Sequence, residues 1–129
     1  MKYLWDTNIV IYYLQQQFSP NAEKYIDSLL LKSPPVISAI TEIELLCWKT
    51  KSKKDIQVLQ SFISDSFVIE LEQTIKNKTA EIRKTSNIKL PDAIIAATAI
   101  LYDLELVSRN TKDFKNIKGL SLINPFEVQ

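Results

Sequence analysis

Five acidic side chains occur where short apolar segments of this chain end or pass into the next segment. They are Asp6, Glu42, Glu44, Asp92 and Asp113. Carboxylates that converge on one crevice repel one another unless a cation lies between them. Mg²⁺ or Mn²⁺, bound by carboxylates and water, is the usual solution in proteins. The pattern therefore predicts a metal site of oxygen ligands, provided that the fold brings these residues together.

Several other catalytic chemistries are excluded by residues that the chain lacks. It contains no histidine, which removes Ser-His-Asp and Cys-His catalysis and metal binding by imidazole. Its only glycine, Gly119, cannot form a Walker loop or a Gly-x-Gly-x-x-Gly turn. Its single cysteine, Cys47, cannot form an intrachain disulfide or a cysteine-rich zinc site, and we expect it to be a small buried hydrophobe. An enzyme of this composition must rely on carboxylates with hard metal ions.

Length and composition predict a single globular domain over residues 1–129. No apolar run approaches the ~18 residues of a membrane span, and the N-terminus does not resemble a secretory signal. We therefore expect a cytoplasmic protein without a membrane contact. The net charge of +1 argues against a protein that coats nucleic acid through charge alone, although it allows a local basic rim around an acidic site.

Short apolar segments alternate with segments of helical spacing along the whole chain. Strands are expected at residues 3–5, 36–38, 67–71, 106–108 and 120–123. Helices are expected at 9–14 with a cap at Thr7 or Asn8, then at 20–32, 41–49 and 55–63, in a segment ending near 85, and at 90–101. This alternation predicts an α/β fold with a parallel sheet between helices, but the strand order is not readable from it. Asp6 follows the first strand, where open α/β sheets place their ligand crevice.

The segment 90–101 predicts the clearest helix of the chain. Pro91 suits the first helical turn, and Asp92 complements the positive end of the helix. The several alanines of this segment leave little side-chain bulk, which is typical of a helix that packs closely against a sheet or a partner.

Each acidic residue also has a purely structural interpretation. Asp6 by itself would be a turn or capping residue, and Asp92 stabilises the start of a helix without any ligand. Asp113 is equally typical of a cap for the short segment that follows it. Glu42 and Glu44 are two positions apart and point to roughly opposite sides of a helix, so only one of them can face a shared site. Helical periodicity alone does not decide which.

Four segments, in this order and spacing, resemble the PIN domain family and, within it, the VapC-type toxin ribonucleases of toxin–antitoxin pairs. They are residues 4–9, 37–45, 90–99 and 106–114. Each segment alone is a weak signal, but four in order cover essentially the whole chain. The resemblance implies a three-layer α/β/α sandwich with a short-stranded parallel sheet.

The resemblance also implies which acids bind the metal, Mg²⁺ or Mn²⁺. Asp6 and Asp92 match the family's two principal metal-ligand aspartates, and Glu44 matches its glutamate because it directly precedes the leucine of that helix. Many relatives have an aspartate where this chain has Asn110, with Asp113 three residues further on. We expect Asn110 to offer a carbonyl oxygen or to orient water, and Asp113 to ligate directly or through water.

Several polar and basic residues flank these acids. We expect the polar ones to orient the metal ligands or contact phosphate, although each is also typical of a cap or turn; they are Thr7, Asn8, Ser38, Ser108 and Asn110. Arg109 and Lys112 belong to a basic cluster with Lys115 and Lys118. Such a cluster is usually a solvated face, and its functional interpretation is a rim that attracts RNA phosphates.

The resemblance implies a metal-dependent endoribonuclease that hydrolyses RNA phosphodiester bonds as the toxin of a type II toxin–antitoxin pair. Its expected partners are the RNA substrate, a separately encoded antitoxin protein and a second copy of the chain in a homodimer. The antitoxin would occupy a groove between the early helices. Residues that could line this groove, or equally belong to the core, are Tyr12, Tyr13, Leu14, Phe18 and Trp48.

Two other functions are compatible with parts of the pattern. A catalytically silent binding module would keep the fold and a partner groove; Asn110 favours this interpretation, whereas the intact Asp6, Glu44 and Asp92 count against it. Phosphoryl transfer through an aspartyl phosphate is the other. Haloacid-dehalogenase-like phosphatases need a second aspartate two residues after the nucleophile, where this chain has Asn8, and no acceptor aspartate of a receiver domain is evident.

Overall fold

The strands of the computed structural model, which describes residues 1–128, form one parallel sheet. Within these residues the sheet has five strands in the order β3-β2-β1-β4-β5. The strands are β1 (Tyr3–Trp5), β2 (Val36–Ser38), β3 (Phe67–Ile69), β4 (Glu105–Val107) and β5 (Leu122–Ile123). The parallel sheet of short strands confirms the prediction, and the strand order adds what the sequence pattern did not reveal.

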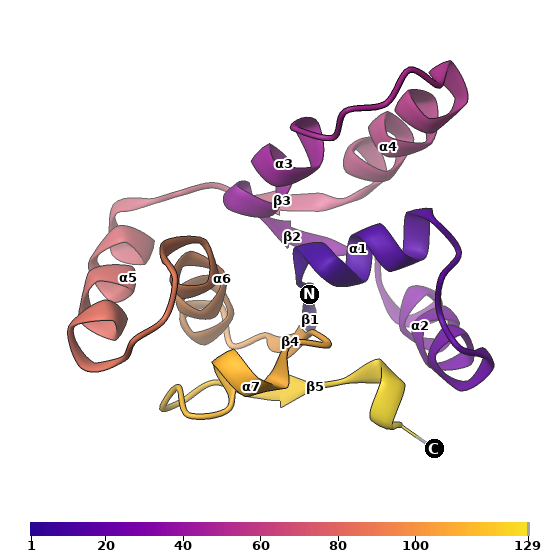
Figure 1. Cartoon of the computed structure of the whole chain (residues 1–129). Helices are drawn as coiled ribbons and strands as arrows, with labels where there is room; N and C mark the ends of the chain where they lie inside the picture. The colour runs from indigo at the N-terminus through magenta and orange to yellow at the C-terminus, as the bar shows by residue number, and fades with distance from the viewer. Residues whose placement is uncertain (129) are drawn as a thin grey trace.

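Helices cover both faces of the sheet, which confirms the three-layer α/β/α sandwich (Figure 1). On one side lie α5 and α6, and on the other side lie α1 and α2, with α3 and α4 beyond β2 and β3. The helices are α1 (Thr7–Leu14), α2 (Pro20–Lys32), α3 (Ala39–Leu46), α4 (Lys53–Asp65), α5 (Gln73–Thr85), α6 (Leu90–Leu101), α7 (Thr111–Phe114) and the 3₁₀ helix η1 (Pro125–Glu127). In the part of the chain described here, no helix is both long and apolar enough to cross a membrane.

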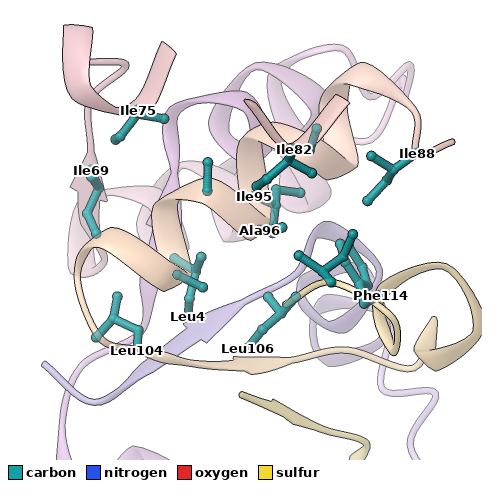
Figure 2. Packing of buried hydrophobic residues seen from close by; sticks show 14 of the residues in the cluster. Leu4, Ile69, Ile75, Ile82, Ile88, Ile95, Ala96, Leu104, Leu106 and Phe114 are labelled. Carbon is teal, nitrogen blue, oxygen red and sulfur yellow. The ribbon is translucent and has the colours of Figure 1, made fainter. Parts of the chain in front are cut away.

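Successive strand residues alternate between two hydrophobic clusters, because side chains along a strand point to opposite faces. Leu4 and Leu106 pack in the cluster under α5 and α6 (Figure 2). Their neighbours Trp5 and Val107 pack in the second cluster, with residues of α1, α2 and α4. Both faces of the central strands are therefore buried, as expected for a parallel sheet between two helix layers.

Alanines let α6 lie close to the sheet. Ala93, Ala96, Ala97 and Ala99 are all completely buried. Figure 2 shows Ala96 and its neighbour Ile95 on the side of the helix that faces Leu4 and Leu106. The expectation of a closely packed alanine-rich helix is confirmed, and this packing fixes where the first turn of α6, with Asp92, meets the sheet edge.

The structure corrects two local expectations. The cap of α1 is neither Thr7 nor Asn8 but Asp6, whose side chain accepts a hydrogen bond from the backbone N–H of Thr7. Cys47 is exposed rather than buried, because α3 ends at Leu46 instead of continuing to residue 49 and leaves Cys47 at its C-cap. Other boundaries differ by one to three residues, which is ordinary fraying of helix and strand ends.

Replacing Ala96 by leucine tests the close approach of α6. The larger side chain has no room between helix and sheet, so Ala96→Leu should lower the free energy of unfolding by about 1–3 kcal/mol. The matched control is Ala80→Leu on the exposed face of α5, which should change it by less than about 0.5 kcal/mol. Urea unfolding followed by circular dichroism measures both, and equal effects would contradict the packing described here.

Candidate functional site

The site lies at the point in the sheet where the strand order reverses, between β1 and β4. The chain adds β2 and β3 on one side of β1, then returns to place β4 and β5 on the other. In open α/β sheets, ligands bind outside the carboxyl ends of the strands at such a switch point. Asp6 follows β1 here and Ser108 follows β4, and the backbone N–H of Asp6 donates to the carbonyl oxygen of Val107 over 2.9 Å.

The carboxylate of Asp6 is buried and held by three donors. Asp6 is 4% exposed. The hydroxyl of Ser108 donates to its Oδ2 over 2.7 Å, and the side-chain amide of Asn8 donates to the same oxygen over 3.2 Å. The backbone N–H of Thr7 donates to Oδ1 over 2.8 Å. These bonds fix the orientation of the carboxylate from both adjoining strand ends.

Burial raises the pKa of Asp6 from 3.8 to about 6. The hydrogen bonds from Ser108 and Thr7 act in the opposite direction because they stabilise the ionised form. The negative charges of Asp92 and Glu44 raise the pKa further. A carboxylate with this pKa accepts a proton or a cation more readily than an ordinary surface aspartate does.

Asp92 shares the electrostatic environment of the other acids. It lies in the first turn of α6, and partial burial raises its pKa. The charges of Asp113 and Glu44 also raise it, while Lys89 opposes them. Repulsion between negative charges therefore links Asp92 to Asp6, Glu44 and Asp113, and links Asp6 to Glu44.

Glu44 reaches the site through Thr7. The hydroxyl of Thr7 donates to Oε1 of Glu44 over 2.6 Å, although Glu44 is on the exposed side of α3. Because Thr7 directly follows Asp6, this contact places Glu44 beside the first strand end. Glu42 is not among the groups of residues 1–128 that shift the pKa of Asp6 or Asp92. Of the two glutamates, the structure brings Glu44 to the other acids.

Asn110 connects Asp113 to the centre of the site. Its side-chain amide donates to Oδ2 of Asp113 over 3.0 Å, and its backbone N–H donates to the Ser108 hydroxyl over 2.9 Å. Ser108 in turn donates to Asp6. Asp113 lies inside α7 and does not cap a following segment, which corrects that alternative. Asn110 thus holds Asp113 from the same loop that orients Asp6.

Ser38 and Thr41 form a buried pair behind Glu44. Ser38 is 1% exposed and caps α3 by accepting a hydrogen bond from the backbone N–H of Thr41. This burial leaves Ser38 no surface for a phosphate contact. Sequence reasoning missed Thr41, which is completely buried and lies 2.9 Å from the Thr7 hydroxyl. Its spacing of three residues from a capping serine was the signal available for finding it.

Arg109 packs against aromatic rings at the rim of the site. Its guanidinium lies 4.2 Å from the ring centroid of Phe126 and 5.5 Å from that of Tyr12, and it donates to the Tyr12 hydroxyl over 3.1 Å. Its backbone N–H faces Oδ1 of Asn8 at 3.5 Å. Arg109 is nevertheless exposed, as is Lys112 on α7. The role of Phe126, close to the end of the chain, had no signal in the sequence.

The aromatic and apolar residues expected in a partner groove have different surroundings. Leu14 and Trp48 line a cavity of about 140 Å³ that also includes Ile11, Leu45, Cys47 and Glu44. Tyr13 packs on Trp5 and Phe62 in the core. Tyr12 and Phe18 pack on Phe126 instead. Tyr13, Leu14, Phe18 and Trp48 are all partly buried against the same core cluster, so lining a cavity and packing on the core are not exclusive for these residues.

The donor set fits a divalent cation in its chemistry. Within residues 1–128, no three acidic or cysteine side chains are close enough to one another to hold one metal ion as they lie here. The four acids nevertheless provide the oxygen donors that Mg²⁺ and Mn²⁺ bind. A cation among them would also relieve the repulsion that raises the pKa values of Asp6 and Asp92.

Comparisons with known proteins agree over nearly the full chain. The PIN domain family profile matches residues 3–120. The chain is 33% identical over 133 aligned positions to "Ribonuclease VapC2" of Rickettsia felis, covering 96% of this chain and 98% of that protein. It is 27% identical over 128 positions to "tRNA(fMet)-specific endonuclease VapC" of Shigella flexneri, covering 93% and 95%. A chain of a solved toxin–antitoxin complex from Klebsiella pneumoniae superposes with a TM-score of 0.79 at 34% identity, covering 98% and 100%.

The raised pKa of Asp6 predicts a pH-dependent effect of Asp6→Asn on stability in the absence of divalent metal. The folded state holds the Asp6 proton more tightly than the unfolded chain, so this group stabilises the fold below about pH 3.8 and loses that contribution as pH rises through about 6. The difference in free energy of unfolding between Asp6→Asn and the wild type should therefore change by about 2 kcal/mol between pH 4 and pH 7. The change favours the variant, because only the wild type loses the contribution of the Asp6 proton.

Urea unfolding at both pH values in EDTA measures this difference. Asp65→Asn, which removes an exposed negative charge at the end of α4, controls for the general effect of net charge. A difference between Asp6→Asn and the wild type that stays constant with pH would contradict the burial of an ionisable Asp6.

Proposed function

This chain belongs to the PIN domain family, and we propose that it is a metal-dependent endoribonuclease that acts as the toxin of a type II toxin–antitoxin pair. One observation carries the proposal: the buried Asp6 carboxylate at the strand switch point, oriented by three donors and neighboured by Glu44, Asp92 and Asp113. Full-length relatives named as ribonucleases support the reaction class.

The cofactor of this proposal is Mg²⁺ or Mn²⁺, held by Asp6, Glu44 and Asp92 with help from Asp113. When bound, such an ion activates water and stabilises the negative charge that develops on the phosphodiester. The remaining work falls to the protein's own side chains. Ser108 and Asn8 orient Asp6, the Thr7 hydroxyl orients Glu44, and the Asn110 amide orients Asp113. This arrangement needs no histidine, which the chain does not contain.

Arg109 and Lys112 are the proposed contacts to the RNA backbone. Tyr12 and Phe126 hold the Arg109 guanidinium beside the site without covering it completely. A guanidinium fixed in this way suits phosphate, which it binds through paired N–H donors. Lys112, exposed on α7 three residues after Arg109, adds a second positive charge. Together they offset the repulsion between an acidic site and a polyanionic substrate.

The proposed protein partners are an antitoxin and a second copy of this chain. The 140 Å³ cavity beside Glu44 is lined mainly by apolar side chains, among them Ile11, Leu14 and Trp48. An apolar residue of an antitoxin segment fits such a cavity and would bring the segment next to the acidic site. The similarity to a chain of a toxin–antitoxin complex supports this partner. The homodimer and a cytoplasmic location follow from family membership as part of the same proposal.

Removal of single metal-binding carboxylates should abolish RNA cleavage. Asp6→Asn and Asp92→Asn should each reduce Mg²⁺- or Mn²⁺-dependent cleavage by about a hundredfold or more, since even residues that only orient metal ligands typically contribute ~10- to 100-fold. Cleavage of labelled RNA by the purified, antitoxin-free protein measures the loss, and circular dichroism shows whether each variant remains folded.

The two neighbouring glutamates of α3 supply a matched control. Glu44→Gln should reduce cleavage about as strongly as Asp92→Asn, whereas Glu42→Gln should leave it within about twofold. Wild-type rates in both aspartate variants would refute the proposed site. A wild-type protein that binds neither metal nor RNA would favour a silent binding module, and phosphoryl labelling of Asp6 would favour phosphotransfer.

The position of Arg109 predicts a salt-dependent effect on RNA affinity. Arg109→Ala should raise KM several-fold and reduce the slope of log KM against log salt concentration by about 0.7, the value for one lost phosphate contact with a single strand. Arg109→Lys should restore the salt slope but only part of the affinity, because lysine lacks the planar group that packs on Phe126. Lys84→Ala, an exposed charge on α5, is the control. An unchanged salt slope in Arg109→Ala would show that this side chain does not contact RNA.

A further inference from the structure

A chain of hydroxyl groups leads from the protein interior to Glu44. It begins at the buried Ser38, whose Oγ lies 3.4 Å from Oγ1 of Thr41. Oγ1 of Thr41 lies 2.9 Å from Oγ1 of Thr7, and Thr7 reaches Oε1 of Glu44 over 2.6 Å. The four residues come from α1 and from the start and outer face of α3. The path therefore joins two elements that are far apart in sequence.

Glu44 determines the direction of every hydrogen bond in this chain. An ionised carboxylate only accepts, so the single hydroxyl proton of Thr7 must point to Glu44. The Thr41 hydroxyl is then the donor in its bond with Thr7, because Thr7 has no proton left to give. Thr41 in turn accepts from the Ser38 hydroxyl. The bond that Thr41 donates holds the Thr7 oxygen in the position from which its proton reaches Glu44.

The hydroxyl of Thr41 has a different hydrogen-bond partner from the buried hydroxyls of Thr79 and Thr98. Thr79 and Thr98 each donate to the carbonyl oxygen four residues earlier in their own helix, over 2.7 Å. That bond satisfies a buried polar group locally and connects nothing else. Thr41 is completely buried, yet its hydroxyl contacts a side chain of another helix that carries the bond on to Glu44.

We propose that Thr41 is a positioning residue that holds Glu44 at the metal-binding edge through the Thr7 hydroxyl. Glu44 is exposed, and a free glutamate on a helix surface samples many rotamers, which must be lost when it binds a cation. The Thr7 hydroxyl, fixed by Thr41, selects one of them in advance. This inference rests on the proposed function in one respect, namely that Glu44 is a metal ligand.

The test compares Thr41→Val, which removes the hydroxyl at nearly constant volume, with Thr41→Ser, which retains it. Thr41→Val should weaken Mn²⁺ binding, measured by calorimetry on the full chain, by about tenfold, the lower range for residues that orient metal ligands. Thr41→Ser should bind within about threefold of the wild type. Thr79→Val removes another buried hydroxyl, one that bonds only to its own helix backbone, and should not change Mn²⁺ affinity.

A double-mutant cycle with Glu44→Ala shows whether Thr41 acts through Glu44. In the Glu44→Ala background, Thr41→Val should cause no further loss of Mn²⁺ affinity, because the side chain that it positions is gone. Equal losses in both backgrounds would overturn the proposal. So would a Thr41→Val variant that has a lower Tm but wild-type Mn²⁺ affinity, since that result describes a purely structural threonine.

Thermal unfolding of the same single and double variants in EDTA distinguishes a failure of this inference from a failure of the proposed function. If the wild type binds no Mn²⁺, metal dependence itself fails, but the hydroxyl chain still predicts that the Tm shifts of Thr41→Val and Glu44→Ala are not additive. Additive Tm shifts in EDTA would overturn the coupling of Thr41 to Glu44 whatever the metal result. Non-additive shifts without Mn²⁺ binding would retain the coupling and reject Glu44 as a metal ligand.

Discussion

The buried charge of Asp6 is the constraint on which the rest of the site depends. An ionised carboxylate at 4% exposure is costly unless hydrogen-bond donors surround it. Here the donors come from the start of α1, through Thr7 and Asn8, and from the residue after β4, Ser108. Satisfying one carboxylate therefore fixes the start of α1 against the end of β4 at the centre of the sheet.

From Asp6 the orienting contacts extend in two directions. On one side, Ser108 and the backbone of Asn110 connect the carboxylate to Asp113. On the other side, Thr7 serves two acids at once, since its backbone N–H donates to Asp6 and its hydroxyl donates to Glu44. The acids are thus connected through hydrogen bonds to common neighbouring residues, and they also interact through their charges. This explains how carboxylates that raise one another's pKa can still be held at one edge of the sheet.

The helix layers supply the remaining geometry. Close packing of α6 on the sheet, made possible by its buried alanines, sets the position of Asp92 relative to the strand ends. On the opposite side of the site, Phe126 of the last helical turn packs on Arg109. The rim of the site is thereby built from both ends of the chain, with Tyr12 of α1 and Phe126 of η1 meeting at one guanidinium.

The sequence by itself determined the parallel α/β architecture, the absence of histidine and nucleotide-loop chemistry, and the acids that follow strand ends. Those features depend on local spacing and residue type, which short-range periodicity records. Only the tertiary structure decided the strand order, the exposure of Cys47 and the contacts that bring Glu44 and Ser108 to the residues at the end of β1. The deciding contacts join residues 37 and 102 positions apart, as in Thr7–Glu44 and Asp6–Ser108. Such contacts are set by how the strands are ordered and how the helices pack on them, and local sequence spacing carries no record of either.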